Sequence, residues 1–405
     1  MFPSLCTILS AAAALTATVN AIPQDGSWGG GLGGGSGSSS STTSSIAVAA
    51  AASASSSASS AASSTASAAS STSTTACNNS PDLCSRAYNN ITHMGAHDSA
   101  FLRDSSTSDS IAGTQYYNAT VALDAGIRLL QAQVHDLNGA IELCHTSCSL
   151  LDAGTLEAWL GDIKTWMDDN PNEVVTLLLV NSDSKDAADF GSVFSSSGID
   201  TYGYTPSGDG WPTLQEMISA DTRLVTFIAS ITADSDYAYL LSEFDYVFET
   251  AYDITSLSGF NCTLDRPSSQ DSAAAAIEAG LMPLMNHFKY NALGASIEVP
   301  DVDNIAITNS PDTNTTGNLG LHAQTCNDEW GIIPTFVLVD FFNEGPAITT
   351  ADNLNGIEAE GRSTAAETTT TVSTSTAAPP PRNSGMGAGV LVAFLVATAA
   401  TLVLL

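Results

Sequence analysis

Short apolar runs alternate with helix-like patterns along the middle of this 405-residue chain. Residues 174–180 are mostly apolar and β-branched, which predicts a strand buried on both faces, as in a parallel sheet. Just before this run, apolar residues recur at helical spacing over 156–167. Thr155 is a good N-cap for that helix, and Asn170-Pro171 ends it because proline cannot continue the backbone hydrogen bonding.

The same alternation continues toward the C-terminus. Residues 213–216 carry a capping-box pattern for a second helix. Further strands are expected at 224–228, 246–249, 281–286 and 335–340. Alternating strands and helices predict the α/β class, and the stretch 77–350 has the size of one (β/α)8 TIM barrel. We therefore expect a single domain at 77–350.

The N-terminal part of the chain has a biased composition. Residues 1–21 are apolar and uncharged and end in small residues, which is typical of a secretory signal peptide, although the usual basic n-region is missing. The alternative is a buried N-terminal helix, but residues 22–76 are almost entirely Gly, Ser, Ala and Thr and offer it no core. We expect 22–76 to be a disordered stalk whose Ser and Thr can carry O-glycans.

The C-terminal part is biased as well. Residues 351–384 form a Ser/Thr/Pro-rich linker, and residues 385–405 form an uncharged hydrophobic tail. A membrane span is normally followed by basic residues on its cytoplasmic side, and none follow here. A polar stretch before a terminal apolar tail is the pattern of a glycosylphosphatidylinositol (GPI) attachment signal, which places the mature protein on the outer cell surface. A tail-anchored or single-span protein is the alternative.

The ionic balance argues against two classes of partner. The chain has 10 Lys+Arg against 42 Asp+Glu, a formal net charge of −32. Generic nucleic-acid binding needs a basic face that displaces phosphate counterions, so it is excluded. Docking on anionic membranes uses basic clusters and is disfavoured. We expect a monomer that meets the membrane only through its lipid anchor.

The cysteines fit an exported protein. Cys6 lies in the predicted signal peptide, and the even number that is left implies disulfides. Fifteen pairings are possible, and sequence proximity favours Cys77–Cys84 and Cys144–Cys148, which leaves Cys262–Cys326. N-x-S/T sequons, which fit a secreted glycoprotein, occur at Asn78, Asn90, Asn118, Asn261 and Asn314.

Two histidines and two aspartates are candidates for acid–base chemistry near neutral pH: His97, Asp98, His145 and Asp340. A carboxylate beside an imidazole orients and charges it. His145 lies between Cys144 and Cys148, so a disulfide there would fix the loop that presents it. A structural histidine is the alternative in each case.

Several predicted strands end in a polar or ionisable residue. In a parallel barrel the C-terminal strand ends meet at one mouth, where the chemistry is placed. For any single one of these residues, the alternative is a polar group that merely faces a loop. The residues are His93, Gln133, Asn181, Glu249, Asn286 and Asp340.

Three motifs resemble a known family. The Gly95-Ala96-His97-Asp98-Ser99 element, residues 123–128 and residues 170–175 are similar to the X-domain of phosphatidylinositol-specific phospholipases C, above all to the secreted fungal PLC-like phosphodiesterases. The resemblance covers residues 77–347. It implies a distorted (β/α)8 barrel that cleaves a phosphodiester by internal attack.

The resemblance also implies a role for each candidate. His97 takes the proton of the attacking hydroxyl, with Asp340 as its support. His145 protonates the leaving alkoxide, assisted by Asp98. Each imidazole thus has a carboxylate that sets its tautomer, as the acid–base chemistry independently requires.

The chain departs from the family where the phosphate is bound. Bacterial members have an arginine at the position of Gln133, and calcium-dependent members have acids at the positions of Gln131 and Gln133. Two neutral amides are left as weaker substrate-binding groups, and His135 is a further candidate to supply positive charge. Asn181 stands where bacterial relatives have a substrate-binding lysine. We therefore expect no metal and no cofactor.

Two functions compete. The first is a surface phosphodiesterase of lipid metabolism that cleaves a phosphoinositol-type or related glycerophosphodiester substrate without metal. The second is a catalytically degenerate barrel that acts as a cell-wall or carbohydrate-associated surface protein. The presence of all four acid–base candidates in one chain favours the enzyme. Neither a G-x-S-x-G elbow nor a metal-type His/Cys cluster supports another enzyme class.

Overall fold

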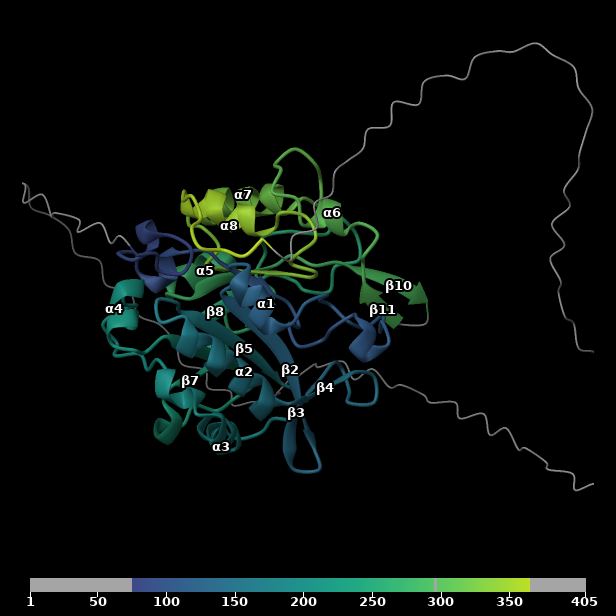
Figure 1. The fold of residues 1–405 in the computed structure, drawn as a ribbon. Coiled ribbons are helices and arrows are strands. Elements are labelled where there is room, and N and C mark those ends of the chain that lie inside the picture. The colour runs from purple at the N-terminus through teal and green to yellow at the C-terminus, as the bar shows by residue number, and fades with distance from the viewer. Residues whose placement is uncertain (1–74, 295–296, 365–405) are drawn as a thin grey trace, which may run out of the picture. The chain divides into compact units, whose positions relative to one another are not determined.

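The computed structural model describes residues 75–294 and 297–364, which are drawn in colour in Figure 1. The predicted signal peptide (1–21), nearly all of the predicted stalk (22–76) and the predicted tail (385–405) lie outside these residues, as do residues 365–384 of the predicted linker. Within the described ranges, no helix combines the length and apolarity needed to cross a bilayer.

Eight parallel strands form the central sheet, in the order β7-β6-β5-β2-β1-β12-β9-β8. Apolar side chains cover both faces, so the strands are buried almost throughout. One apolar cluster lies inside the curled sheet, and another lies between the sheet and the outer helices. The strands are β1 (His93–Ala96), β2 (Leu129–Leu137), β5 (Val175–Asn181), β6 (Leu224–Ala229), β7 (Leu240–Ser242), β8 (Val247–Glu249), β9 (Met282–Asn286) and β12 (Phe336–Val339).

The cylinder is open at one seam. In the described part of the chain β7 pairs with β6 and β8 with β9, but no ladder joins β7 to β8. The free edge of β8 instead carries an isolated antiparallel bridge between Glu249 and Arg266. The expected distorted barrel of parallel strands is confirmed, and this seam is its distortion.

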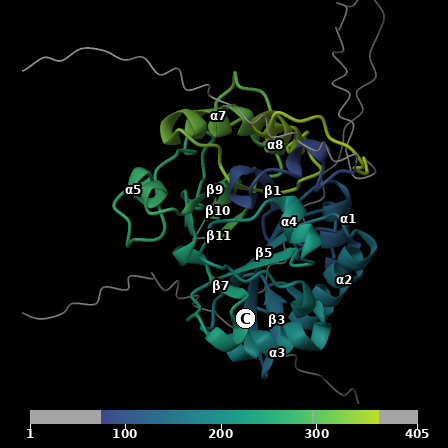
Figure 2. The same cartoon turned by 90° about the vertical axis from the view of Figure 1, so that its left-hand side faces the viewer.

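Helices surround the sheet, as Figure 2 shows. The two helix starts expected from capping patterns are confirmed, because Thr155 caps α2 through Ala158 N and Thr213 forms a capping box with Glu216. The helices are α1 (Ala119–Asp124), α2 (Leu156–Asp169), α3 (Ala187–Ser197), α4 (Leu214–Ser219), α5 (Ala273–Glu278), α6 (Ile305–Thr308), α7 (Leu319–Trp330) and α8 (Ile348–Asn355).

Two antiparallel additions extend from the strand ends. β3 (Ala140–Cys144) pairs back onto β2 and is followed by β4 (Asp152–Thr155). After β9, a hairpin of β10 (Tyr290–Gly294) and β11 (Ile297–Pro300) projects from the barrel (Figure 1). Short 3-10 helices complete the unit at Pro81–Leu83, Tyr88–Asn90, Ser105–Thr107, Ile199–Tyr202, Ser235–Tyr237 and Glu243–Asp245.

His93 does not lie at the mouth, contrary to the expectation from the strand ends. It is the first residue of β1 and therefore belongs to the opposite end of the barrel. Burial lowers the pKa of His93 to about 4, and its Nε2 bonds to the carbonyl of Tyr88. His93 is a neutral structural histidine.

The folded unit extends past the predicted boundary at residue 350. That boundary falls inside α8, which continues to Asn355. Arg362 then pairs with Asp352, and the backbone of Glu360 bonds to Asn79. The first residues of the predicted linker are thus part of the domain, because ion pairs and backbone hydrogen bonds hold a segment whose composition is not that of a core.

All three predicted disulfides are present: Cys77–Cys84, Cys144–Cys148 and Cys262–Cys326. Cys262–Cys326 joins the loop after β8 to α7 across 64 residues, and it therefore constrains the unfolded chain most. Cys144–Cys148 closes a loop of four positions and acts locally.

One sequon differs from the other four. Asn90, Asn118, Asn261 and Asn314 are exposed. Asn78 is buried, its Oδ1 accepts a hydrogen bond from Val174 N, and its Nδ2, the atom that would carry the glycan, is enclosed. Asn78 is therefore a structural residue in the folded domain rather than a glycan acceptor.

Candidate active site

Three neighbouring strands bring candidate residues to one level of the barrel. β1 pairs in parallel with both β12 and β2 through Gly95. Side chains alternate between the faces of a strand, so the residues two positions beyond this level, which are Asp340, His97 and Gln131, lie together on the inner face. Gly95 makes room beneath them, because a Cβ there would lie 2.8 Å from leucine side chains of both neighbouring strands.

His97 lies between two carboxylates. Its Nδ1 is 2.8 Å from Asp340 Oδ1, and its Nε2 is 3.6 Å from Asp98 Oδ2. The ring also stacks on Phe288, with centroids 3.6 Å apart. Burial alone lowers the pKa of His97, but the charges of Asp98 and Asp340 outweigh it, so the pKa is raised above its ordinary value. The Nδ1–H donates to Asp340, which leaves Nε2 to exchange a proton.

Asp98 is the carboxylate that the other groups share. It is fully buried, and its Oδ2 lies 3.3 Å from His145 Nε2 and 3.0 Å from Gln133 Nε2 as well as near His97. Its Oδ1 has no hydrogen-bond partner in the described residues. The two imidazoles therefore meet around one oxygen atom of Asp98.

His145 reaches the site from the β3–β4 connection. It follows Cys144, the last residue of β3, and the disulfide to Cys148 closes the loop that holds it. The edge of Phe101 contacts its ring at right angles, with centroids 5.2 Å apart. The predicted role of this disulfide in presenting His145 thus has a geometric basis.

The backbone takes unusual conformations beside these residues. Most described non-glycine residues with positive φ are Asn, Asp or Ser, which tolerate that region in turns. The two exceptions are Thr146 (φ 60°), directly after His145, and Phe341 (φ 44°), directly after Asp340. Asp98 itself has φ 46°. Such conformations persist only where surrounding contacts impose them, and they gather at functional sites.

The two glutamine amides are bonded within the protein. Gln131 Oε1 accepts from Asp98 N at 2.6 Å. Gln133 donates to Asp98 Oδ2 and accepts from Thr146 N at 3.1 Å. The two amides, expected as substrate-binding groups, thus contact Asp98 and the loop that carries His145.

The other two substrate-binding candidates lie elsewhere. His135 Nδ1 is 3.4 Å from Asp183 Oδ2, and within the described residues no contact joins it to His97, His145 or their carboxylates. Asn181 bonds to both backbone groups of Lys185 and to the carbonyl of Ser230. Asn181 thus ties two loops together, and neither residue is part of the imidazole–carboxylate group.

A buried acid pair and an arginine lie near the site. Glu249, at the end of β8, contacts Arg266 and Asn286. Burial raises the pKa of Glu249, but Arg266 outweighs it and the pKa is lowered, whereas burial and the charge of Glu249 raise the pKa of Glu243 well above its usual value. Sequence reasoning found Glu249 and Asn286 as strand-end residues but missed Arg266, which lies 17 positions beyond the strand and has no motif around it.

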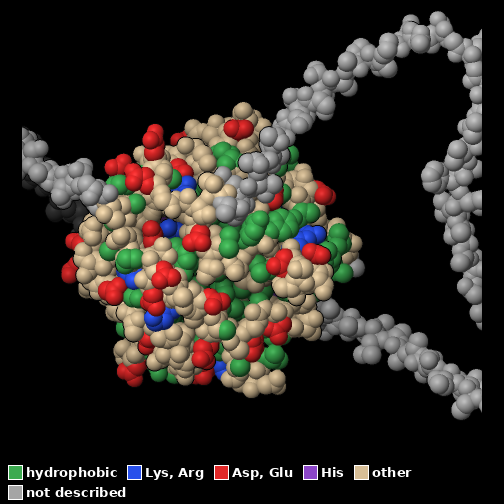
Figure 3. Space-filling model, viewed as in Figure 1, with side chains coloured by type: hydrophobic (Ala, Val, Ile, Leu, Met, Phe, Trp, Pro, Cys, Tyr) green, Lys and Arg blue, Asp and Glu red, His purple; other side chains and the backbone are tan. Residues whose placement is uncertain are grey.

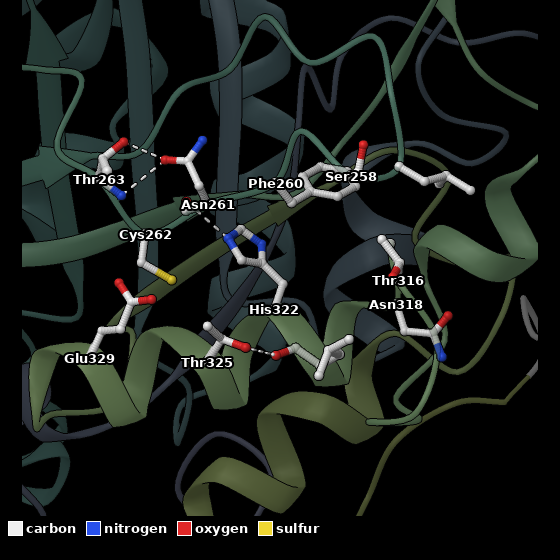
Figure 4. A pocket seen from close by; sticks show the side chains of 13 residues that line it. Ser258, Phe260, Asn261, Cys262, Thr263, Thr316, Asn318, His322, Thr325 and Glu329 are labelled. Carbon is white, nitrogen blue, oxygen red and sulfur yellow. Dashed lines mark hydrogen bonds between the residues drawn. The ribbon is translucent and has the colours of Figure 1, made fainter.

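A separate pocket lies between the 257–263 loop and α7. Its volume is about 310 Å³, and Figure 4 shows Phe260, Asn261 and His322 on its walls. In the described residues, the only group of His, Cys, Asp or Glu close enough to share a metal ion is here, at Cys262, His322 and Cys326. The two sulfur atoms form a disulfide and cannot act as thiolates, so this group does not fit a metal.

Comparison with known proteins agrees with the motifs. A family model described as PI-PLC X 1 matches residues 83–355. A PI-PLC X domain-containing protein of Arthroderma benhamiae is 37% identical over 289 residues, which cover 69% of this chain and 90% of the relative. An uncharacterized secreted protein of the same fungus is 35% identical over 304 residues, or 72% of this chain and 66% of the relative, just under two thirds of its length.

A more distant relative and a solved structure complete the comparison. A PI-PLC X domain-containing protein of Arabidopsis thaliana is 23% identical over half of this chain and 49% of its own length. Phosphatidylinositol-specific phospholipase C from Listeria monocytogenes is 16% identical, with a TM-score of 0.45 over 67% of this chain and 94% of that one. The family model matches well over half of this chain, and the chain therefore belongs to the PI-PLC X domain family.

Proposed function

We propose that the protein is a phosphoric diester hydrolase of the phospholipase C type, acting on a phosphoinositol-type or related glycerophosphodiester lipid. The observation that carries the proposal is the convergence of two imidazoles on one buried carboxylate, with His97 and His145 both beside Asp98. Displacement at phosphorus needs a base for the attacking oxygen and an acid for the leaving oxygen, and this arrangement offers both.

The hydrogen-bonding partners of the two imidazoles suggest which one is the base and which one is the acid. A hydroxyl oxygen attacks phosphorus and its proton passes to Nε2 of His97, while Asp340 holds Nδ1–H and stabilises the imidazolium that forms. The P–O bond to the leaving group breaks, and the leaving oxygen takes a proton from protonated His145. Asp98 supports that acid through its 3.3 Å contact. When the attacking hydroxyl belongs to the head group, the product is a cyclic phosphodiester.

Negative charge grows on the phosphoryl oxygens during the reaction. On β2 no arginine or lysine is present to stabilise it, so the protonated imidazole of His97 would do so. Gln131 and Gln133 are neutral. Asp98 and Asp340 raise the pKa of His97, so they stabilise the imidazolium that forms when His97 takes the proton. Once His97 holds the transferred proton, it faces the phosphoryl group as a cation. We expect turnover to be slower than in family members that have an arginine or a metal in that place.

A lipid substrate is supported by the rim of the mouth. Exposed apolar side chains lie on the connections that follow strand ends: Ile111 after β1, Leu150 beside His145, and Leu293 and Ile297 on the β10–β11 hairpin, all 52–60% exposed. Figure 3 shows hydrophobic side chains gathered where this hairpin lies. An apolar rim around a polar site suits an amphiphilic substrate whose head group enters the barrel.

A catalytically degenerate barrel that acts as a cell-wall or carbohydrate-associated surface protein is the second candidate. The neutral amides of Gln131 and Gln133 favour it, because the family's usual phosphate-neutralising groups are missing there.

The first prediction tests the catalytic assignment. His97→Ala and His145→Ala should each lower turnover of phosphatidylinositol by on the order of 10²–10⁴-fold, as for a positioned acid or base. Wild-type turnover should survive a divalent-cation chelator. His93→Gln is the matched control, because His93 lies at the other end of β1 and should affect stability only. Loss of activity on chelation, or wild-type activity in either alanine variant, would contradict the assignment.

The second prediction tests the apolar rim. Leu293→Ser combined with Ile297→Ser should lower kcat/KM on phospholipid vesicles by about tenfold, since two side chains lose part of their transfer free energy. Activity on a soluble head-group phosphodiester should stay unchanged. Ile332→Ser is the matched control, since Ile332 is also exposed but precedes the start of β12. Equal losses on both substrates would refute a lipid-docking rim.

We also propose that the protein is exported and held on the outer surface by a GPI anchor. The three disulfides and the relative named as a secreted protein support export, and the predicted tail supports the anchor. Treatment of intact cells with a GPI-cleaving enzyme should release the protein into the medium. Retention on the membrane with Leu405 still present would contradict the anchor.

A further inference from the structure

The Gln133 side chain connects two parts of the candidate active site. On one side its Nε2 donates to Asp98 Oδ2 at 3.0 Å. On the other side its Oε1 accepts from the backbone N–H of Thr146 at 3.1 Å. One amide therefore spans the β2 strand, the end of β1 and the loop that carries His145.

Thr146 is held in a conformation that it does not favour alone. A β-branched residue with φ 60° is sterically strained, so contacts must impose the left-handed backbone. The hydrogen bond to Gln133 is such a contact, and the disulfide between Cys144 and Cys148 is another. In this conformation Thr146 Oγ1 lies 3.4 Å from His145 Nδ1.

The two contacts of His145 thus have a common origin. Its Nε2 faces Asp98, which Gln133 holds, and its Nδ1 faces Thr146, which Gln133 also holds. The amide side chain has a donor and an acceptor, so it can donate to a carboxylate and accept from a backbone N–H at the same time.

We propose that Gln133 and Thr146 form a positioning bridge that aligns His145 with Asp98, and that Gln133 does not neutralise the phosphoryl group. The proposal rests on the proposed phosphodiesterase function for its kinetic consequences. Bacterial members have an arginine at this position, so the simplest expectation is that a cation at position 133 would raise activity. The proposal reverses that expectation, because such a cation could pair with Asp98 but could not accept a hydrogen bond from Thr146 N–H. Adding the positive charge would then free the His145 loop.

Three substitutions separate the two halves of the bridge. Gln133→Glu keeps an acceptor for Thr146 and loses the donor to Asp98. Gln133→Lys keeps a donor to Asp98 and loses the acceptor. Gln133→Leu loses both. Thermal melting checks that each variant folds. If one variant does not fold, the other two can still be compared with wild type.

Two readouts are needed. The first is amide hydrogen exchange at Thr146, measured by NMR, which should speed up at least tenfold in the Lys and Leu variants and stay near wild type in the Glu variant. The second is steady-state kinetics on phosphatidylinositol. Lys and Leu should lower kcat by about 10²-fold with KM nearly unchanged, as expected when a reacting group is displaced by about 1 Å.

The opposite results are equally clear. A Lys variant with raised kcat would show that the site needs a cation at position 133, and a raised KM with unchanged kcat would show that Gln133 binds substrate. Unchanged exchange at Thr146 in the Leu variant would overturn the bridge itself. If wild type cleaves no phosphodiester, the proposed function fails, whereas the exchange measurement still decides the bridge.

Discussion

The candidate site depends on the buried carboxylate of Asp98. A buried charge is costly unless hydrogen bonds and opposite charges surround it. The structure compensates it at one oxygen atom, Oδ2, which accepts a hydrogen bond from Gln133 and has the imidazoles of His97 and His145 within 3.6 and 3.3 Å. Because the three groups come from different parts of the chain, the need to compensate this charge brings the two imidazoles together.

The same constraint explains the backbone around the site. Asp98 adopts a left-handed conformation that turns its side chain back into the barrel, and its own N–H is bonded to Gln131. Thr146 and Phe341 repeat this conformation next to His145 and Asp340. Conformations of this kind lower stability, so the fold retains them where they place side chains that regular strands could not.

Acidic groups set the electrostatics of the candidate site. The chain carries a net charge of −32, and Asp98, Asp340 and Glu249 all act on His97. These carboxylates raise the pKa of His97. In the proposed reaction the unprotonated base is available only as pH rises through that raised pKa, so the onset of activity would lie at higher pH than with an unperturbed histidine.

Patterns carried by neighbouring residues were predictable from the sequence. The caps at Thr155 and Thr213, the runs that became β5 and β6, and the disulfides Cys77–Cys84 and Cys144–Cys148 depend on local spacing. The four acid–base candidates, too, were proposed from the short motifs that surround them. These signals survive in a single sequence since each involves only a few adjacent positions.

Features that depend on tertiary contacts were not predictable. His93 was placed at the wrong end of its strand because the strand begins, rather than ends, at that residue. The contact between Gln133 and Thr146 depends on how β3 folds back on β2, and the burial of Asn78 depends on β5 lying beside it. Arg266 reaches Glu249 only because the barrel seam is open there. None of these contacts leaves a pattern along the chain.

The most direct test of the role of Asp98 is an NMR pH titration of the His97 imidazole in the wild-type protein and in the Asp98→Asn variant. In the wild type, His97 should titrate above the usual value of 6.5, and in the variant its pKa should fall, because the charge of Asp98 contributes most to raising it. If His97 titrates at the same pH in both proteins, Asp98 does not control the charge of the site and this account is wrong.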